Sequence, residues 1–258
     1  EIASCLVGSE MCIRDSNSFD MSTCREFTVE AGRPDTIDIA KLFALKENKV
    51  DRISINPQTV NNEVLKTIGR KHTAQQFFDA FELARKCGFD NINTDLIAGL
   101  PTDTTESFKN SLDSIVRLNA ECITVHTLCM KRASRLTTEG VTLDLQQARD
   151  AREMLAYTQN VLGQNEYIPY YMYRQSRMVG NLENVGWSKR GFESLYNVYV
   201  MDETHTILAC GSGGVTKLKR NNPDYLERIF NFKYPYEYID RFDELIQRKS
   251  GIMQFYGQ

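Results

Sequence analysis

Polar side chains that could hold a charged ligand follow the apolar, strand-like runs of this 258-residue chain. Glu30 ends one such run, and Gln58 follows the next. Asp95 lies within a third run, and Arg70 stands on the connection that precedes it. Two carboxylates, an amide and a guanidinium together offer both signs of charge and both hydrogen-bonding roles. We therefore expect these residues to hold a polar, zwitterionic ligand.

A nucleophile paired with an activating base is not indicated. The chain has only three histidines and lacks a Gly-x-Ser-x-Gly motif. The sequence therefore does not indicate the usual pair of a nucleophile and its base. His72 stands at an expected helix start, which favours a local structural role. His126 lies between a strand and a loop, and both a structural and a functional role stay open. No catalytic residue is assigned.

Four strand-like segments alternate with helix-like segments between residues 26 and 128. Because helical connections of this length join parallel neighbours, the pattern predicts a parallel sheet. The carboxyl ends of parallel strands meet at one edge, where the polar residues should converge. The spacing fits about four strands of a TIM-like (βα)6 barrel, so the predicted fold class is α/β. The expected strands are Glu26–Glu30, Arg52–Asn56, Asn91–Ile97 and Cys122–Thr127.

Three regions are expected along the chain. Residues 1–16 resemble translated sequencing-adaptor sequence, so we treat them as an artefact and expect the natural protein to extend further upstream. Residues 17–135 are the expected partial barrel, and residues 136–258 an α+β accessory region. In the accessory region we expect a helix over 145–162, a tyrosine-rich stretch, strands near Leu195–Val200 and Thr206–Ala209, and helices around Tyr225–Phe232 and Tyr236–Arg248.

Composition excludes several classes of partner. The chain has 31 basic and 34 acidic residues and a net charge of -3, which indicates neither a nucleic-acid partner nor an anionic membrane surface. No apolar stretch approaches the roughly 20 residues of a membrane span, so a cytoplasmic location is the default expectation. The seven cysteines have no repeated spacing, which predicts neither a disulfide framework nor a metal site in this chain.

Longer motifs surround the polar residues. Thr-Val-Glu-Ala contains Glu30, Ile-Ser-Ile-Asn-Pro-Gln ends at Gln58, Ile-Gly-Arg ends at Arg70, and Asn-Ile-Asn-Thr-Asp-Leu-Ile-Ala-Gly-Leu-Pro contains Asp95. In order and spacing they resemble the oxygen-independent coproporphyrinogen III oxidases of the radical S-adenosylmethionine (SAM) superfamily. Downstream, the segments 173–175, 178–186 and 210–214 are similar to the bacillus-type coproporphyrinogen dehydrogenase branch. The resemblance covers nearly the whole chain after residue 16.

The resemblance implies a cofactor site. Glu30, Gln58, Arg70 and Asp95 would contact S-adenosylmethionine, with the backbone of Cys129 facing its adenine. Arg70 can pair with the methionyl carboxylate, and a carboxylate can accept from the ribose hydroxyls or the ammonium group. The alternative is that the two carboxylates cap loops and that Arg70 forms a surface ion pair.

The chain departs from the family at the iron-sulfur cluster. The family holds a 4Fe-4S cluster on a Cys-x3-Cys-x2-Cys loop, because thiolates ligate the iron. Cys5, Cys12 and Cys24 have other spacings, and the glycine-rich segment expected after the second strand is also absent. We expect the cluster ligands in the full-length parent, together with an external electron donor, and expect this polypeptide alone to be inactive.

The implied substrate is a small-molecule porphyrinogen. Arg174, Asn181 and Asn184 are candidates to contact it, because propionates favour arginine and amide donors. The tyrosine-rich stretch fits core packing better than substrate binding. The implied reaction is oxidative decarboxylation of coproporphyrinogen III to protoporphyrinogen IX, and the alternative is a haem-binding chaperone of the same superfamily. An unrelated TIM-barrel lyase would be favoured if the four expected cofactor residues lay far apart.

Overall fold

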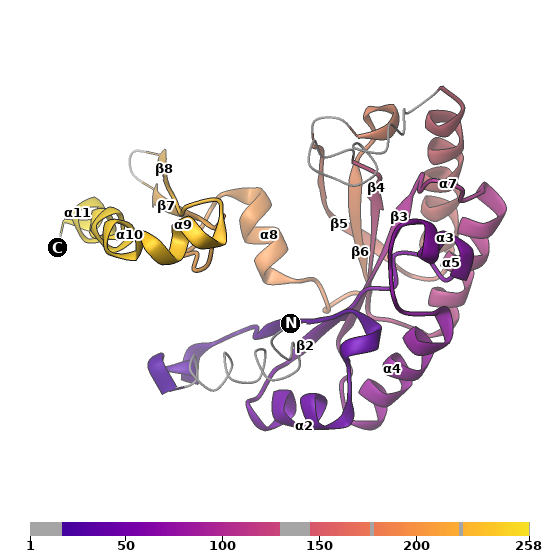
Figure 1. Cartoon of the computed structure of the whole chain (residues 1–258), viewed down its shortest axis with the longest axis horizontal. Helices are drawn as coiled ribbons and strands as arrows, with labels where there is room; N and C mark the ends of the chain where they lie inside the picture. Colours follow the sequence, from indigo (N-terminus) through magenta and orange to yellow (C-terminus); the bar gives the residue numbers. More distant parts are fainter. Residues whose placement is uncertain (1–16, 130–144, 176–177, 222–223, 258) are drawn as a thin grey trace. The chain divides into compact units, whose positions relative to one another are not determined.

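The computed structural model describes residues 17–129, 145–175, 178–221 and 224–257 (Figure 1). The expected artefact at residues 1–16 lies outside the described residues. Contacts between residues divide the chain into two compact units, Glu1–Ser194 and Leu195–Gln258. The accessory region expected over 136–258 is therefore split, because its first part belongs to the same unit as the parallel strands.

A six-stranded sheet in the order β1-β2-β3-β4-β6-β5 forms the first unit. The first four strands pair in parallel, which confirms the prediction of four parallel strands, and β6 pairs antiparallel with both β4 and β5. The antiparallel pair was not expected from the sequence. The strands are β1 (Thr28–Gly32), β2 (Arg52–Ile55), β3 (Ile92–Ala98), β4 (Cys122–Thr127), β5 (Ile168–Tyr173) and β6 (Asn184–Ser188).

The helices between the parallel strands begin at residues that satisfy their free N–H groups. Thr73 begins α4 (Ala74–Lys86) with a capping box, because it exchanges hydrogen bonds with Gln76. Thr104 caps α5 (Thr105–Arg117) through its hydroxyl, which accepts a hydrogen bond from Ser107 N. The other helices of this unit are η1 (Met21–Thr23), η2 (Pro34–Thr36), α2 (Ile39–Glu47), α3 (Asn62–Thr67), α7 (Leu145–Gln164) and η3 (Val179–Asn181).

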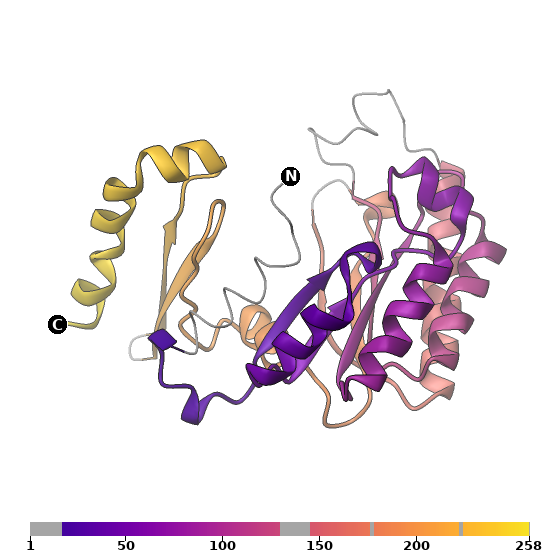
Figure 2. The same cartoon turned by 60° about the horizontal axis from the view of Figure 1, so that its bottom comes forward.

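One face of the sheet is apolar and forms the main core with the helices. Successive side chains of a strand point to opposite faces, so every second residue reaches this side. Figures 1 and 2 show α2, α4, α5 and α7 along the same side of the sheet. The strands contribute Ile53, Ile55, Ile92, Leu96, Ile123 and Val125 to this core, and the helices contribute Leu42, Phe77, Phe81, Leu112 and Met154.

The opposite face of the sheet carries polar side chains. Parallel register places Ser54 beside Asn93, and Asp95 beside Thr124. Neighbouring residues in register share a face and can contact one another across strands. The polar residues of consecutive strands therefore form one continuous row.

The described part of the second unit contains a β-hairpin and four helices, and it corrects three expectations. The strand expected near Thr206–Ala209 is reduced to one bridge between Ile207 and Lys217. β7 (Val215–Asn221) pairs antiparallel with β8 (Asp224–Phe230) through seven residue pairs, so the helix expected around Tyr225–Phe232 is wrong. The strand expected near Leu195–Val200 is also wrong, because those residues form α8. Helices over Tyr236–Arg248 are confirmed. The helices are α8 (Leu195–Asp202), α9 (Pro235–Asp240), α10 (Phe242–Lys249) and α11 (Gly251–Tyr256).

Within the described ranges, none of the helices combines the length and the apolar character needed to cross a membrane.

Candidate functional site

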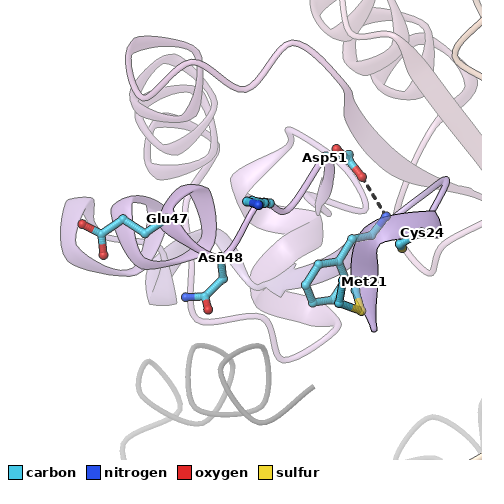
Figure 3. Close-up of a pocket in the computed structure, with 7 residues that line it drawn as sticks. Met21, Cys24, Glu47, Asn48 and Asp51 are labelled. Atoms are coloured by element: carbon cyan, nitrogen blue, oxygen red, sulfur yellow. Dashed lines mark hydrogen bonds between the residues drawn. The ribbon is translucent and has the colours of Figure 1, made fainter. Parts of the chain in front are cut away.

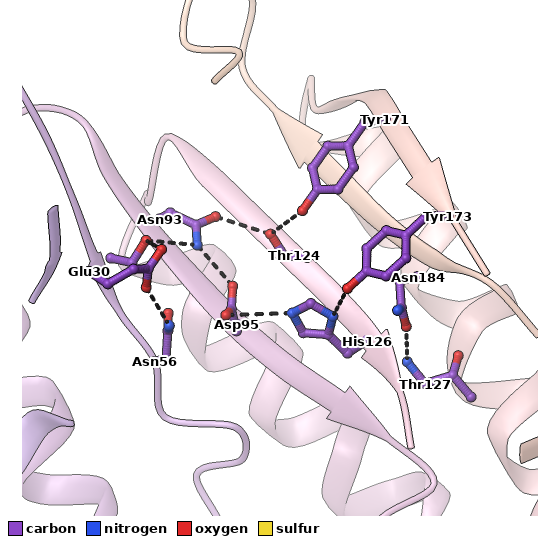
Figure 4. Close-up of polar contacts among 11 residues, drawn as sticks. Glu30, Asn56, Asn93, Asp95, Thr124, His126, Thr127, Tyr171, Tyr173 and Asn184 are labelled. Carbon is purple, nitrogen blue, oxygen red and sulfur yellow. Dashed lines mark hydrogen bonds and ion pairs between the residues drawn. The ribbon is translucent and has the colours of Figure 1, made fainter. Parts of the chain in front are cut away.

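The polar row begins at Glu30 on β1 and reaches Asp95 on β3 (Figure 4). Glu30 accepts a hydrogen bond from the Ser54 hydroxyl at 3.0 Å and from the Asn56 amide at 3.2 Å. The Asn93 amide lies 3.3 Å from the Ser54 hydroxyl and donates to Asp95 Oδ1 at 2.8 Å. The two carboxylates expected at the site therefore belong to one hydrogen-bonded network.

The position of Glu30 raises the pKa of its carboxyl group. Although the residue is exposed, its carboxylate bonds down onto the sheet, where it loses part of its surrounding water. That loss of water is the largest cause of the raised pKa, and the negative charge of Asp95 raises the pKa further. Hydrogen bonds from Ser54 and Asn56 act in the opposite direction but do not cancel the rise. A cationic or hydrogen-bond-donating ligand would relieve this repulsion.

Gln58 lies directly beside Asp95 at the end of β2. Its backbone N–H donates to the Asp95 carbonyl at 3.0 Å, and its carbonyl accepts from Ile97 N at 2.9 Å. Gln58 has a φ of +69°, which is uncommon for a residue other than glycine. The residue is also 7% exposed. These two hydrogen bonds to β3 therefore hold an unusual backbone conformation next to Asp95.

Arg70 follows α3 and is half-buried. Loss of water lowers the pKa of its guanidinium, and the positive charge of Arg33 lowers it further, while the negative charges of Asp35 and Asp95 raise it. The side chain is thus close enough to the site to sense Asp95. Of the four residues expected to hold the cofactor, Glu30 and Asp95 lie within β1 and β3, Gln58 follows β2 and bonds the backbone of β3, and Arg70 follows α3.

His72 has the structural role that the sequence favoured. Its ring is 2% exposed, and Nε2 lies 3.2 Å from the carbonyl oxygen of Pro57. Burial lowers the pKa of this imidazole. The ring therefore stabilises the loop that follows β2.

Cys129 lies past the end of β4, next to the segment that leads into η3. Its backbone forms an antiparallel bridge with Met178, and the neighbouring Leu128 carbonyl accepts from Val179 N at 2.9 Å. This pairing fixes the backbone at Cys129, which the family resemblance would place at the adenine.

The three expected substrate residues have different surroundings. Arg174 forms an ion pair with Glu183, and both side chains are partly exposed. Asn181 is exposed and has a φ of +54°. Asn184 is 3% exposed and accepts a hydrogen bond from Thr127 N at 2.7 Å. The amide oxygen of Asn184 is therefore committed to the backbone.

Sequence reasoning left the role of His126 open and missed the contacts that extend the row toward β5. Thr124 donates to Asn93 Oδ1 at 3.2 Å and lies 3.4 Å from the Tyr171 hydroxyl. His126 Nε2 lies 3.5 Å from Asp95 Oδ2, and its Nδ1 lies 3.5 Å from the Tyr173 hydroxyl. Polar residues two positions apart on β3 and on β4 were the available signal, because that spacing puts both on one face.

Tyr171 reaches the row because Gly186 lies beneath its ring. A Cβ atom at Gly186 would lie 1.8 Å from Tyr171 Cε1, which is far inside contact distance. Burial also raises the pKa of the Tyr171 hydroxyl, so the phenol keeps its proton. The glycine therefore allows a tyrosine of β5 to lie across β6.

A separate cavity lies at the opposite end of the strands (Figure 3). It has a volume of about 360 Å³, and Phe27 N at its wall donates to Asp51 Oδ2 at 2.9 Å. Phe27 and Asp51 precede β1 and β2, so this cavity is remote from the carboxyl ends that carry the polar row. It is lined by Met21, Cys24, Phe27, Glu47, Asn48, Lys49 and Asp51.

The described cysteines do not fit an iron-sulfur site. No group of three potential metal-ligating side chains occurs within the described ranges, and Cys5 and Cys12 lie outside them. The described cysteines, at positions 24, 87, 122, 129 and 210, form no disulfide with one another, and they are dispersed over both units. The donor set of the polar row, by contrast, fits a zwitterionic organic ligand.

Comparison with known proteins identifies the domain that carries the polar row. Residues 25–115 match the sequence model of the Radical SAM superfamily. The chain is 41% identical over 235 residues to the Bacillus subtilis oxygen-independent coproporphyrinogen-III oxidase-like protein HemZ, across 91% of this chain and 47% of that protein. It is 33% identical over 217 residues to the heme chaperone HemW of Lactococcus lactis, across 80% of this chain and 52% of that protein.

A solved structure has the same fold. The coproporphyrinogen III oxidase HemN of Escherichia coli, described as a radical SAM enzyme, matches with a TM-score of 0.68 and 19% identity. The match covers 92% of this chain and 53% of the HemN chain. The chain thus spans about half the length of the curated relatives it matches.

Proposed function

We propose, from the premise that this chain carries a radical SAM superfamily domain, that its polar row binds S-adenosylmethionine. The observation that carries the proposal is the grouping of Glu30, Gln58 and Asp95 between the middle and the carboxyl end of three adjacent parallel strands, with Arg70 near enough to sense Asp95. Ligands of α/β folds bind at this end of the strands. The row offers both signs of charge, together with an amide that can donate and accept hydrogen bonds. These groups match those of a zwitterionic nucleoside derivative.

Each residue has a role that its chemistry supports. Asp95 and Glu30 would accept hydrogen bonds from the ribose hydroxyls or from the methionyl ammonium. Arg70 would pair with the methionyl carboxylate in a charge-assisted hydrogen bond. Gln58 supplies a donor and an acceptor, and the backbone at Cys129 would border the adenine. A bound cation or donor would also relieve the repulsion that raises the pKa of Glu30.

The iron-sulfur cluster of the family supplies, when bound, the electron that cleaves the sulfonium. The cysteines of this chain do not have the Cys-x3-Cys-x2-Cys spacing, so they do not fit the cluster. We therefore assign this chain binding of the cofactor, and no step of its cleavage. In a whole protein, the cluster ligands and an electron donor would come from outside these residues.

For the whole protein we propose oxidative decarboxylation of coproporphyrinogen III to protoporphyrinogen IX. The identity to a coproporphyrinogen-III oxidase-like protein over 91% of this chain supports this substrate class. Arg174 and Asn181 are exposed and could meet the substrate propionates. Asn184 is a weaker candidate, because its buried amide oxygen bonds the backbone. A haem carrier is the second candidate, supported by 33% identity to a heme chaperone.

Titration calorimetry with S-adenosylmethionine tests the cofactor site on the chain itself. We expect saturable binding by the wild-type chain and binding at least about tenfold weaker in Asp95→Ala, because a hydrogen-bonded charge is lost. Asp79→Asn, at a position on the outer helix α4, is the matched control and should bind normally. Wild-type affinity in Asp95→Ala would reject the site.

A second experiment separates the two activities. Full-length protein with its cluster reconstituted is incubated anaerobically with coproporphyrinogen III and, in parallel, with haem. Formation of protoporphyrinogen IX supports the oxidase. Tight haem uptake without any decarboxylation would support the carrier.

A further inference from the structure

We infer that His126 is a positioning residue that fixes the carboxylate of Asp95, and that Tyr173 and Asn184 set the hydrogen-bonding direction of His126. The inference rests on the proposed function, because Asp95 is a proposed cofactor ligand. It gives a role to a histidine that the sequence left open. It also gives Asn184 a role other than substrate binding.

Each oxygen of the Asp95 carboxylate has one side-chain nitrogen beside it. The Asn93 amide donates to Oδ1 at 2.8 Å, and His126 Nε2 lies 3.5 Å from Oδ2. The Asn93 amide cannot turn freely, because its own oxygen accepts from the Thr124 hydroxyl at 3.2 Å. A carboxylate held on both sides keeps one rotamer and presents its remaining lone pairs in a fixed direction.

The direction of the hydrogen bonds follows from the backbone. Asn184 Oδ1 accepts from Thr127 N at 2.7 Å, so its NH₂ group is the part that remains to bond the Tyr173 phenol. In the arrangement that we infer, the phenol oxygen accepts from that amide and its proton points to His126 Nδ1, 3.5 Å away. A neutral imidazole that accepts at Nδ1 carries its proton on Nε2. That proton faces Asp95.

Packing keeps this chain of contacts in place. The rings of His126 and Tyr173 meet edge to face, with centroids 6.5 Å apart. Burial raises the pKa of the Tyr173 hydroxyl, so the phenol stays a donor. Figure 4 shows Asp95, His126 and Tyr173 joined in turn, with Asn184 next to Tyr173 and bonded to Thr127. Both 3.5 Å contacts are long, and we expect them to shorten when a ligand engages Asp95.

The β5–β6 pair therefore supports the cofactor site from the side. Tyr173 acts on one oxygen of Asp95 through His126, and Tyr171 lies against Thr124, which orients Asn93 on the other oxygen. Both tyrosines belong to β5, which pairs with β6 at the edge of the sheet. These strands lie downstream of the matched superfamily residues 25–115.

The test compares four variants of the whole chain by calorimetry with S-adenosylmethionine. His126→Leu removes the donor to Asp95 and should bind about tenfold more weakly. His126→Gln keeps a donor and an acceptor and should bind within about threefold of wild type. Tyr173→Phe removes only the hydroxyl and should weaken binding about threefold. Tyr157→Phe, which removes a hydroxyl bonded to Asp113 on the helical side of the sheet, should have no effect.

Nitrogen-15 NMR of the imidazoles gives a readout that needs no cofactor. The chain has three histidines, and His126 is assigned by the signals lost in His126→Gln. We expect the Nε2–H tautomer in the wild type, and a mixture of tautomers in Tyr173→Phe. A wild-type Nδ1–H tautomer, or unchanged affinity in folded His126→Leu, would overturn the inference. If the wild type does not bind S-adenosylmethionine, the proposed function fails, while the tautomer still tests the contacts.

Discussion

Gly186→Ala should move Tyr171 and loosen the polar row. The new Cβ would lie 1.8, 2.4 and 2.7 Å from three ring atoms of Tyr171. Ordinary contact begins near 3.4 Å, so the ring must shift by about 1.6 Å. The hydroxyl would then leave Thr124, to which it is 3.4 Å distant. Overpacking of this kind costs about 1–3 kcal/mol, and the lower backbone entropy of alanine in the unfolded chain offsets about 0.5–1 kcal/mol.

We therefore expect Gly186→Ala to lower the free energy of unfolding by about 1–2 kcal/mol in urea titrations followed by circular dichroism. In a Tyr171→Ala background the clash is absent, so the same substitution should be neutral or stabilising. Gly163→Ala on α7 is the control, because no atom lies within 4 Å of the position of its new methyl group. We expect this substitution to stabilise the chain. An equal cost of Gly186→Ala in both backgrounds would show that the tyrosine ring is not the cause.

Three further substitutions test single contacts. Glu30→Gln should stabilise the fold near neutral pH. Because folding raises the pKa of Glu30, its favourable contribution to the free energy of folding is present below the pKa of the unfolded state and is lost as pH rises through the pKa of the folded state. Glutamine stays neutral and has no such loss. Urea titrations from about pH 4 to about pH 8 should show this loss in the wild type and not in the variant, and parallel curves would contradict it. Arg70→Gln should weaken S-adenosylmethionine binding by about tenfold or more and Arg70→Lys by less, because the ammonium keeps the charge without the planar fork; calorimetry in which the two variants match the wild type would exclude a direct role. Asn184→Ala should cost about 1–3 kcal/mol in unfolding free energy by leaving the buried Thr127 N–H without its acceptor, whereas Asn184→Asp, which keeps an acceptor, should cost less; a stable Asn184→Ala would make the residue a candidate substrate contact again.

The parallel part of the fold was readable from the sequence because local signals agreed with the tertiary structure. Apolar strand runs are separated by helices with clear caps, such as the Thr73–Gln76 capping box. The accessory part was not readable in the same way. Leu195–Asp202 is rich in β-branched and aromatic residues yet forms a helix, and Asp224–Phe230 has helix-forming residues yet pairs with β7. Tertiary pairing overrides such local preferences.

The residues of the polar row could be named from the sequence, but the network that joins them could not. Strand ends identified Glu30 and Asp95 as polar groups at one edge of the sheet. The contacts among Asn93, Thr124 and His126 depend on register between strands, which a single sequence does not specify. The role of Tyr171 was hidden further, because it depends on an antiparallel pair and on a glycine beneath the ring.

Whether the polar row is a cofactor site is decided by calorimetric titration of S-adenosylmethionine into the whole chain, with Asp95→Ala and Asp79→Asn measured alongside. We predict saturable binding by the wild type and by Asp79→Asn, and binding at least about tenfold weaker in Asp95→Ala. Absence of binding by the folded wild-type chain, or equal affinity in all three proteins, would contradict the assignment of the polar row to S-adenosylmethionine.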